Sequence, residues 1–307
     1  MNRVKHFGLD VRKHWMLWLM AMPAVLCLII FNYIPMVGLV MAFQDLDFAK
    51  GIFTSPFIGF KNFEFLFAST DAWIVTRNTI LYNVVFIVLN LFLSVGLAII
   101  MHELTCVRYS KVLQTIYIMP HFLSMVVVAT IVYAFLSPTS GFLNSILAEF
   151  GIGRINWYAK KEAWPFILVL VNVWKHVGYN SIVYVATISG ISDEYYEAAL
   201  IDGATKLQQI RYITIPHMRY IIAIKLIMAI GGIFQSDFGL FYTVPRDSGS
   251  LYSVTNVLDT YIYRGMMNLN NMGMSTAAGL YQSVVGFVLV LVANKIVSKI
   301  DPETAMF

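Results

Sequence analysis

The sequence predicts an all-α protein embedded in a lipid bilayer. Of its 307 residues, 59% are hydrophobic and 12% are charged, whereas soluble domains carry about 45–50% apolar and about 25% charged residues. Aromatic residues make up 15% of the chain and the mean hydropathy is +0.71, which excludes a disordered chain. A soluble protein of this composition would have too little polar surface to stay dissolved. The net charge of +4 is too small to indicate a nucleic-acid-binding protein.

Six apolar segments are long enough to cross a bilayer, which takes about 20 residues. The first, Trp15–Phe43, contains no charged residue. It is much longer than the apolar part of a signal peptide, which has roughly 7–15 residues, so we expect a retained span that bends near Pro23 or Pro35. The other spans are expected at Thr79–Met101, Leu113–Ser137, Trp164–Ile191, Tyr220–Phe241 and Met274–Asn294.

Lysine and arginine residues predict the orientation of these spans. Twelve fall on the side that holds both termini, the loops at 102–112 and 192–219, and Lys225 at the entrance of the fifth span, and eight are spread over the longer loops of the other side. Both termini are therefore predicted to be cytoplasmic. The sequence shows no internal repeat and no soluble domain, so it divides into a cytoplasmic segment 1–14, one transmembrane domain 15–300 and a cytoplasmic tail 301–307.

The loop Ser192–Pro216, between spans four and five, carries strong local signals. Ser192 is a suitable N-cap for a helix, and Gly203 can end that helix in the left-handed conformation. Thr205 can start a second helix that runs to Pro216, where the fifth span begins. These signals predict a helix–turn–helix at the cytoplasmic surface of the membrane.

This loop resembles the signature loop of permease subunits in binding-protein-dependent ABC importers. In that family Glu-Ala-Ala is followed after two residues by Asp-Gly-Ala, and then about nine residues on by Ile-x-Leu-Pro. Two positions depart from the pattern, because Ile215 replaces the usual leucine and Tyr220 stands where a second proline is common. The matching residues here are Glu197, Ala198, Ala199, Asp202, Gly203, Ala204, Ile213 and Pro216, with Ile215 at the position of the leucine.

The resemblance implies that the loop is a coupling helix, which docks in a groove on a cytoplasmic ATPase subunit. A connecting hairpin that only caps the helix bundle is the alternative. By the same resemblance the transmembrane domain 15–300 is a permease domain, and the residues from Tyr195 to Ala204 sit in the groove. The residues expected to serve this contact are Tyr195, Tyr196, Glu197, Ala198, Ala199, Asp202, Gly203, Ala204, Ile213 and Pro216.

The resemblance also implies the partners and the location of the chain. It predicts a second, different permease subunit that completes a heterodimer, two cytoplasmic ATPase subunits, and an extracellular or periplasmic solute-binding protein. The chain itself would be no enzyme and would bind no cofactor or metal, because ATP and Mg²⁺ are held by the ATPase partners. The expected location is the bacterial plasma (inner) membrane, with no nucleic-acid partner.

A second stretch narrows the resemblance to one kind of cargo. The segments Phe234–Tyr242 and Val257–Arg264, with Pro245 between them, resemble permeases of the maltose-type carbohydrate importers that carry oligosaccharides cut from polysaccharides. The resemblance therefore implies the import of oligosaccharides into the cytoplasm.

Polar residues within the spans are the candidates for a substrate path. Asn172, Lys175, His176 and Tyr179 share one helical face because they fall at i, i+3, i+4 and i+7. Charged residues within spans usually face a cavity or a partner, so we expect this face to line a water-filled path rather than only to bond neighbouring helices. The other candidates are Gln235, Asp237 and Tyr242 at an interruption in the fifth span, and Asn83 and Asn90 on one face of the second span.

Lys175 and His176 favour an acidic sugar, such as an alginate or pectin fragment, because carboxylates attract cations in a passage of low dielectric constant. The alternative for Lys175 is an ion pair with Asp237. Cys27 and Cys106 are expected to stay unpaired, since one lies in an apolar run and the other in a polar loop.

Other classes of membrane protein are less consistent with the sequence. No phosphate-binding loop, zinc-protease helix or nucleophile elbow is present, so energy would have to come from a partner. An ion-coupled secondary transporter or channel, an ABC importer of a non-sugar solute, and a membrane-embedded enzyme that uses Lys175, His176 and Asp237 are the alternatives. Secondary transporters usually contain inverted repeats with broken helices in both halves, whereas only the fifth span is interrupted here.

Overall fold

The computed structural model describes residues 13–64, 69–104 and 107–300. Within these ranges, five helices are long and apolar enough to cross a membrane, or six if one pair bent by 99° counts as a single span. This confirms the predicted all-α, polytopic class with about six spans. The predicted division at residues 14 and 300 stays a prediction, because residues 1–12 and 301–307 lie outside the described part, as does Cys106.

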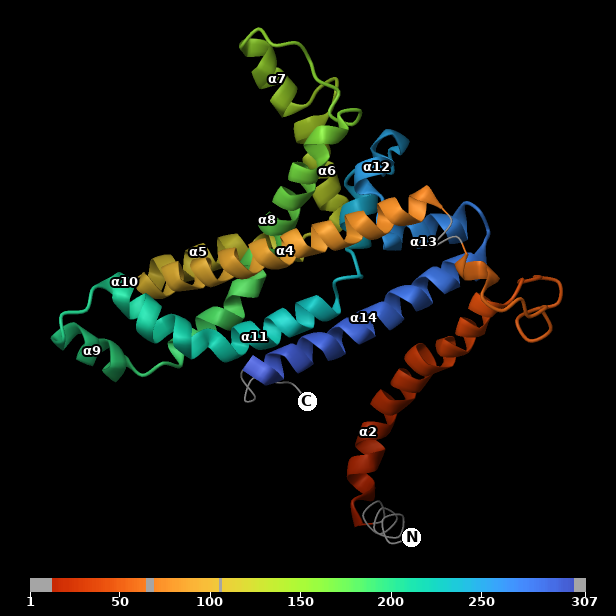
Figure 1. Ribbon diagram of the computed structural model, residues 1–307. Helices are drawn as coiled ribbons and strands as arrows, with labels where there is room; N and C mark the ends of the chain where they lie inside the picture. Colours follow the sequence, from red (N-terminus) through yellow and green to blue (C-terminus); the bar gives the residue numbers. More distant parts are fainter. Residues whose placement is uncertain (1–12, 65–68, 105–106, 301–307) are drawn as a thin grey trace.

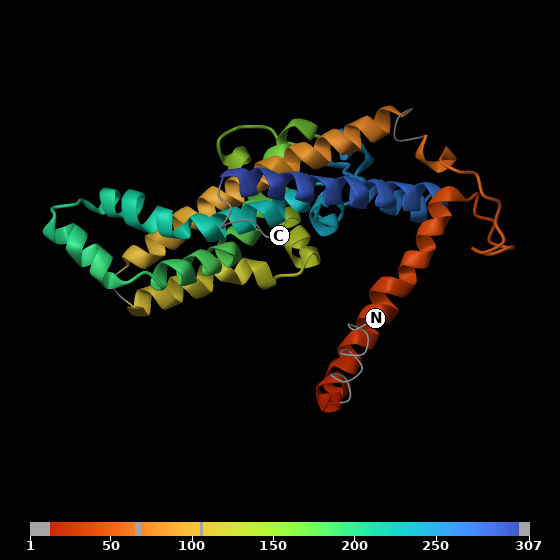
Figure 2. The ribbon, with the colours of Figure 1, turned by 60° about the horizontal axis from the view of Figure 1, so that its bottom comes forward.

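The first span begins with α2 (Trp15–Leu28) and projects away from the other helices (Figures 1 and 2). Every residue of α2 is exposed within the chain, and Pro23 lies inside the helix without ending it. The helix then changes type, first to a π-helix, η1 (Ile29–Tyr33), and then to a 3-10 helix, η2 (Ile34–Phe43), next to Pro35. A change of helix type beside a proline is expected, because proline has no N–H to continue the bonding pattern.

Long helices form the rest of the bundle (Figure 1). α8 (Trp164–Ser189) packs along α4 (Thr70–Glu103) and α5 (Val107–Phe122). α11 (Ile215–Gly231) packs along α14 (Met272–Ile300), and η2 packs on the other end of α14. The second and sixth spans extend beyond their predicted ends, because polar turns continue the helix outside the apolar stretch that a hydropathy argument detects.

The third span is not a single helix from 113 to 137, so this prediction was wrong. α5 ends at Phe122 and α6 (Met125–Leu136) leaves at an angle of 99°. Ser124 has an extended backbone between them, and its hydroxyl accepts a hydrogen bond from the Val127 N–H at 3.4 Å, which caps α6. The break therefore turns the chain sharply within the bundle.

The bounds predicted for the fifth span, 220 to 241, were also wrong at both ends. α10 (Lys206–Gln209) continues through a short π-helix, η5 (Ile210–Thr214), directly into α11. Pro216 does not end this helix, because it lies where the π-helical segment η5 changes to α-helix, directly after the Ile215 N–H that bonds the Ile210 carbonyl, and its missing N–H falls at this change of bonding pattern. The helix ends at Gly231, where two consecutive glycines disfavour helix, and η6 (Gly239–Thr243) follows after an irregular segment.

Shorter helices cap the two ends of the bundle. α9 (Asp193–Ile201) and α10 lie together at one end, well away from α7, α12 and α13 (Figure 1). The remaining elements are η3 (Lys61–Phe63), α7 (Phe142–Glu149), η4 (Lys161–Ala163), η7 (Gly249–Leu251), α12 (Tyr252–Thr255) and α13 (Leu258–Met267).

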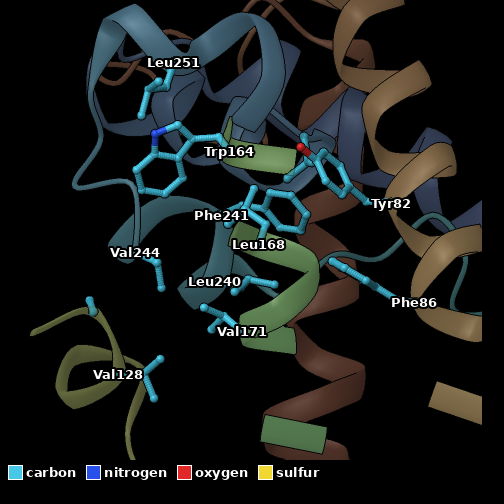
Figure 3. Packing of buried hydrophobic residues seen from close by; sticks show 12 residues of the cluster. Tyr82, Phe86, Val128, Trp164, Leu168, Val171, Leu240, Phe241, Val244 and Leu251 are labelled. Atoms are coloured by element: carbon cyan, nitrogen blue, oxygen red, sulfur yellow. The ribbon is translucent and has the colours of Figure 1, made fainter. Parts of the chain in front are cut away.

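The main apolar core holds η6 between α4 and α8 (Figure 3). Trp164 and Leu168 of α8 are fully buried there, and Phe241 of η6 packs its ring against Tyr82 of α4, with 4.9 Å between the ring centroids. The Tyr82 hydroxyl donates a hydrogen bond to the Val254 carbonyl at 2.8 Å, as buried tyrosines usually require. This core fixes the segment that follows the interruption in the fifth span.

Gly178 allows α8 to approach α5 closely. A Cβ atom at this position would overlap the carbonyl oxygen of Tyr117 in α5. The contact involves backbone rather than a flexible side chain, so α5 would have to move to admit any larger residue.

Replacing Gly178 by valine is therefore expected to destabilise the protein by about 1–3 kcal/mol through overpacking. Thermal unfolding of the purified, detergent-solubilised protein measures this change. Gly96→Ala in α4 is the matched control, because no atom lies within 4 Å of its added Cβ, and alanine favours helix. Equal stability of Gly178→Val and the natural sequence would show that the α5–α8 contact is not tight.

Candidate functional site

The loop between α8 and α11 folds as the sequence predicts. The Ser192 hydroxyl accepts a hydrogen bond from the Glu194 N–H at 3.4 Å and begins α9. Gly203 has a φ of +77° and ends the helical turn. Thr205 and Gln208 form a reciprocal capping box at the start of α10, in which the Gln208 Oε1 atom accepts a hydrogen bond from the Thr205 N–H at 2.7 Å. The predicted helix–turn–helix is confirmed.

Most of the residues predicted for ATPase coupling point away from the bundle. No residue of α9 is buried, and the Tyr195 side chain is 56% exposed. Of the ten predicted residues, those that are half-buried are Tyr196, Ala199, Ala204 and Ile213, and those that are exposed are Tyr195, Glu197, Ala198, Asp202, Gly203 and Pro216.

Tyr196 faces the bundle instead of the surface. Its hydroxyl lies 3.0 Å from the Thr214 Oγ1 atom, and its ring centroid lies 5.8 Å from that of His102 at the end of α4. Lys206 at the start of α10 forms an ion pair with Glu103 of α4, with 3.0 Å between Nζ and Oε2. An exposed pair of this kind adds little stability, but both contacts connect the helix–turn–helix to α4 and η5.

An apolar patch beside the turn was not predicted from the sequence. Leu200, Ile201 and Leu207 are 58%, 86% and 75% exposed. Leu200 and Ile201 occupy the two unspecified positions between Ala199 and Asp202, and Leu207 lies beyond the motif, so the motif residues themselves gave no reason to select them. Three large exposed apolar side chains around one turn are typical of a surface that contacts a partner.

Lys175 supports the break between α5 and α6. Its ammonium group donates hydrogen bonds to the carbonyl oxygens of His121, at 3.1 Å, and Leu123. The side chain is buried, and it satisfies carbonyls that have no helical partner at the end of α5. The alternative ion pair of Lys175 with Asp237 is not formed.

Asp237 lies instead beside His176, the next residue of α8. Their Nε2 and Oδ2 atoms are 3.9 Å apart. His121 of α5 stacks on Tyr179, with 3.9 Å between centroids and 4° between the ring planes, and its centroid lies 5.8 Å from that of His176. The structure therefore brings His176, Tyr179 and Asp237 together and adds His121, which the sequence argument did not select.

The asparagines of the second span have different partners. Asn83 donates hydrogen bonds to the carbonyls of Ile233, at 2.8 Å, and Gln235, at 3.1 Å, in the irregular segment after α11. Asn90 donates to the Oδ1 atom of Asn172 at 2.8 Å. Asn83 and Asn172 are thus engaged within the bundle, whereas the Gln235 side chain is exposed.

Asp259 and Gln282 stabilise the same irregular segment from α13 and α14. The Asp259 carboxylate accepts a hydrogen bond from the Ser236 N–H at 2.7 Å, and Gln282 donates to the Phe234 carbonyl. Burial raises the pKa of Asp259, while the hydrogen bonds from Ser236 and Gln282 act in the opposite direction. Sequence reasoning missed both residues because their partners are distant in the chain.

Tyr242 belongs to an aromatic cluster. Its ring stacks on Phe238, with 4.8 Å between centroids and 16° between planes, and meets Tyr263 edge-on at 5.2 Å. Arg264 forms an ion pair with Asp247 at 2.7 Å and places its guanidinium carbon 5.7 Å from the Tyr242 ring centre. The tyrosine is therefore fixed in place by its neighbours.

A cavity of about 350 Å³ lies between α4, α8 and α11. Asn90, Asn180, Tyr184 and Lys225 contribute its polar groups, and apolar side chains line the rest. Lys225, expected at the entrance of the fifth span, lies inside a helix that begins at Lys206. Within the described residues, no group of three or more His, Cys, Asp or Glu side chains could hold a metal ion, and the Cys27 thiol is free.

Comparisons with known proteins agree with this geometry. Residues 94–302 match the family described as binding-protein-dependent transport system inner membrane component. The polygalacturonan/rhamnogalacturonan transport system permease protein YteP of Bacillus subtilis is 30% identical over 94% of this chain and 89% of its own length. Protein LplB of the same organism is 30% identical over 95% and 91%.

Solved structures show the same fold. A chain from the crystal structure of a bacterial ABC transporter involved in the import of the acidic polysaccharide alginate is 34% identical, with a TM-score of 0.88 over 96% of this chain and 99% of that one. A chain from the alginate transporter in complex with its pentasaccharide-bound periplasmic protein has a TM-score of 0.86 at 34% identity, over 95% and 96%. The chain described here is therefore a multi-pass membrane protein that belongs to the family of inner membrane components of binding-protein-dependent transport systems.

Proposed function

We propose that this chain is the permease subunit of an ATP-driven ABC importer that carries oligosaccharides into the cytoplasm. The observation that carries the proposal is the exposed helix–turn–helix formed by α9 and α10, on a chain of the binding-protein-dependent family. The relatives that handle polygalacturonan and alginate support an oligosaccharide cargo. They also support the finer proposal that the cargo carries carboxylates.

The chain depends on partners for energy and for delivery of the substrate. The exposed face of α9, with the apolar patch of Leu200, Ile201 and Leu207 beside it, fits a groove on a cytoplasmic ATPase. Two such ATPases bind ATP and Mg²⁺ and hydrolyse the ATP, so this chain is not itself the enzyme. A second permease subunit completes a heterodimer, and a solute-binding protein delivers the sugar from the outside.

The contacts of the helix–turn–helix suggest how movement reaches the spans. When the ATPases close, they displace α9, and Tyr196 passes the displacement to Thr214 in η5 and to His102 in α4. The transporter then alternates between two states whose populations the nucleotide shifts. The loop lies at the end of the bundle where α4 also ends. We place both termini on that side of the membrane as well, so that this side faces the cytoplasm.

The substrate path is proposed to run beside the interruption of the fifth span. Gln235 is exposed there, and His176, Tyr179, Asp237 and Tyr242 are only partly buried or exposed. Their polar and aromatic groups suit sugar hydroxyls and sugar ring faces. Of the other predicted path residues, Asn83 and Lys175 bond backbone carbonyls behind this region. Asn90 and Asn172 bond each other through their side chains.

Reconstitution tests the proposed function directly. The chain is purified with the proteins encoded beside it and placed in liposomes, and sugar uptake is measured with and without ATP. ATP-dependent uptake that requires a loaded binding protein is the expected result. Uptake by the chain alone, driven by an ion gradient, would show a secondary transporter instead.

Gly203→Val is expected to reduce binding-protein-stimulated ATP hydrolysis at least about tenfold. The positive φ of Gly203 costs a residue with a side chain roughly 1–2 kcal/mol, and a branched side chain more, so the turn between α9 and α10 would be distorted. The space around Gly203 is open, so the effect comes from backbone conformation rather than from a clash. Gly203→Asn is the control, because asparagine tolerates the left-handed conformation, and similar losses in both variants would contradict this explanation.

Lys175→Met is expected to reduce the uptake of charged and neutral oligosaccharides to the same extent. The ammonium group bonds carbonyls at the α5–α6 break, so its loss exposes buried acceptors and disturbs the fold rather than the recognition of charge. Uptake of an acidic oligosaccharide and of its methyl ester is compared in proteoliposomes, with thermal unfolding measured in parallel. A selective loss of acidic substrate at unchanged stability would show that Lys175 does contact the sugar.

A further inference from the structure

We propose that the cavity between α4, α8 and α11 is a subsite for the carboxylate of an acidic sugar, with Lys225 as its cation. The inference rests on the proposed function and deepens it, because it names the group that selects the substrate. Three features outside the coupling loop support it: the position of Lys225, the polar groups around it that lack partners, and the volume and lining of the cavity.

Lys225 lies deep within a membrane-spanning helix. The helix runs from Lys206, beside the coupling loop, to Gly231. Lys225 is therefore only about 9 Å from the Gly231 end, at 1.5 Å per residue. No salt bridge or hydrogen bond joins Lys225 to another residue of the described ranges 13–64, 69–104 and 107–300. A lysine within a span costs about 2.5–3.5 kcal/mol on insertion scales and usually faces a partner or a water-filled cavity.

The other polar groups of the cavity are also available. The Oδ1 atom of Asn90 is buried and has no hydrogen-bond partner in the described part of the chain. The Asn180 amide, half-buried on α8, likewise bonds no described residue. Buried polar atoms without a partner are rare in folded proteins, and the half-buried Asn180 amide and Lys225 ammonium group line the same cavity as Asn90.

These groups match the chemistry of a uronate. Lys225 provides a positive charge for the carboxylate, and a charge-assisted bond of this type is roughly twice as strong as a neutral one. The half-buried Asn180 amide can donate to a sugar oxygen through its NH₂ group and accept from a sugar hydroxyl through its Oδ1 atom. Among the described residues, no acidic side chain lines the cavity, so none of them competes there for the lysine.

The cavity and the proposed path share the helix α8. Asn90 bonds Asn172 on α8 at 2.8 Å, and His176 follows one turn later on the same helix. Asn180 lies beside Tyr179 in the sequence, so α8 contributes to both places. The volume of about 350 Å³ lies within the range of small-molecule sites, roughly 300–1,000 Å³.

Substitution of Lys225 in the assembled transporter tests the proposal. Proteoliposomes that contain both permease subunits, the ATPases and the binding protein take up a trigalacturonate or its methyl ester, and each variant is compared with the natural sequence for each sugar. Lys225→Met is expected to reduce uptake of the acid about tenfold or more, equivalent to about 1.4 kcal/mol, and uptake of the ester less than about twofold. Lys225→Arg keeps the charge and is expected to retain uptake of both.

The controls separate loss of charge recognition from loss of structure. Lys295→Met removes an exposed lysine of α14 and is expected to leave both uptakes unchanged. Equal losses of acid and ester in Lys225→Met, or no loss of either, would overturn the carboxylate subsite while leaving the importer function intact. If the natural sequence shows no ATP-dependent uptake of either sugar, the proposed function itself fails.

A cysteine at this position makes the test independent of how Lys225→Met folds. Lys225→Cys is introduced after Cys27 and Cys106, the two cysteines of the chain, are replaced by serine. Treatment of the assembled transporter with aminoethyl methanethiosulfonate restores a cation at this position and is expected to restore uptake of the acid. The neutral hydroxyethyl methanethiosulfonate adds no charge and is not expected to restore uptake. The acidic sugar is expected to slow the reaction. A cysteine that water-soluble reagents do not reach, or that the sugar does not protect, would overturn the proposal.

Discussion

Every backbone N–H and C=O inside a bilayer must be bonded within the protein, and this constraint governs the whole bundle. The chain interrupts two spans, at the α5–α6 break and after Gly231, and each interruption releases backbone carbonyls or N–H groups from the helical pattern. Side chains from other helices bond the released groups. Lys175 serves the first interruption, and Asn83, Gln282 and Asp259 serve the second. Irregular backbone within a membrane is tolerated where protein surrounds it in this way.

The same constraint separates two kinds of polar residue within the spans. Lys175 and Asn83 are engaged with backbone carbonyls, so changing them alters the shape of the bundle rather than one contact with a ligand. Lys225 and Asn180 face a cavity and have no partner in the described chain. A polar residue in a span is thus a candidate for substrate binding only when its side chain is not already bonded to backbone groups that a helix break has released.

Local sequence signals predicted the parts of the structure that depend on local chemistry. The helix–turn–helix follows from Ser192, Gly203 and Thr205, whose caps and left-handed turn act within a few residues. The direction of α6 after its break was not predictable, because hydropathy shows how long an apolar segment is but not whether the helix bends within it. The partner of Lys175 lies 52 to 55 residues earlier in the chain, and nothing local indicates that distance. Lys225 was misplaced because Pro216 was taken as the start of the span, whereas the helix begins at Lys206.

The continuity of that helix gives the fold a direct mechanical link between its two ends. From Lys206 to Gly231 it contains 26 residues, or about 39 Å at 1.5 Å per residue. One end starts at the turn beside α9, and the other ends at the interruption beside the proposed path, with Lys225 in between. A helix transmits displacement because its hydrogen bonds resist stretching, so under the proposed mechanism a movement of α10, which follows α9 after the Gly203 turn, would reach the cavity without an intervening loop. This helix departs from α-helical geometry at the π-helical segment η5, and Tyr196 contacts η5 through Thr214.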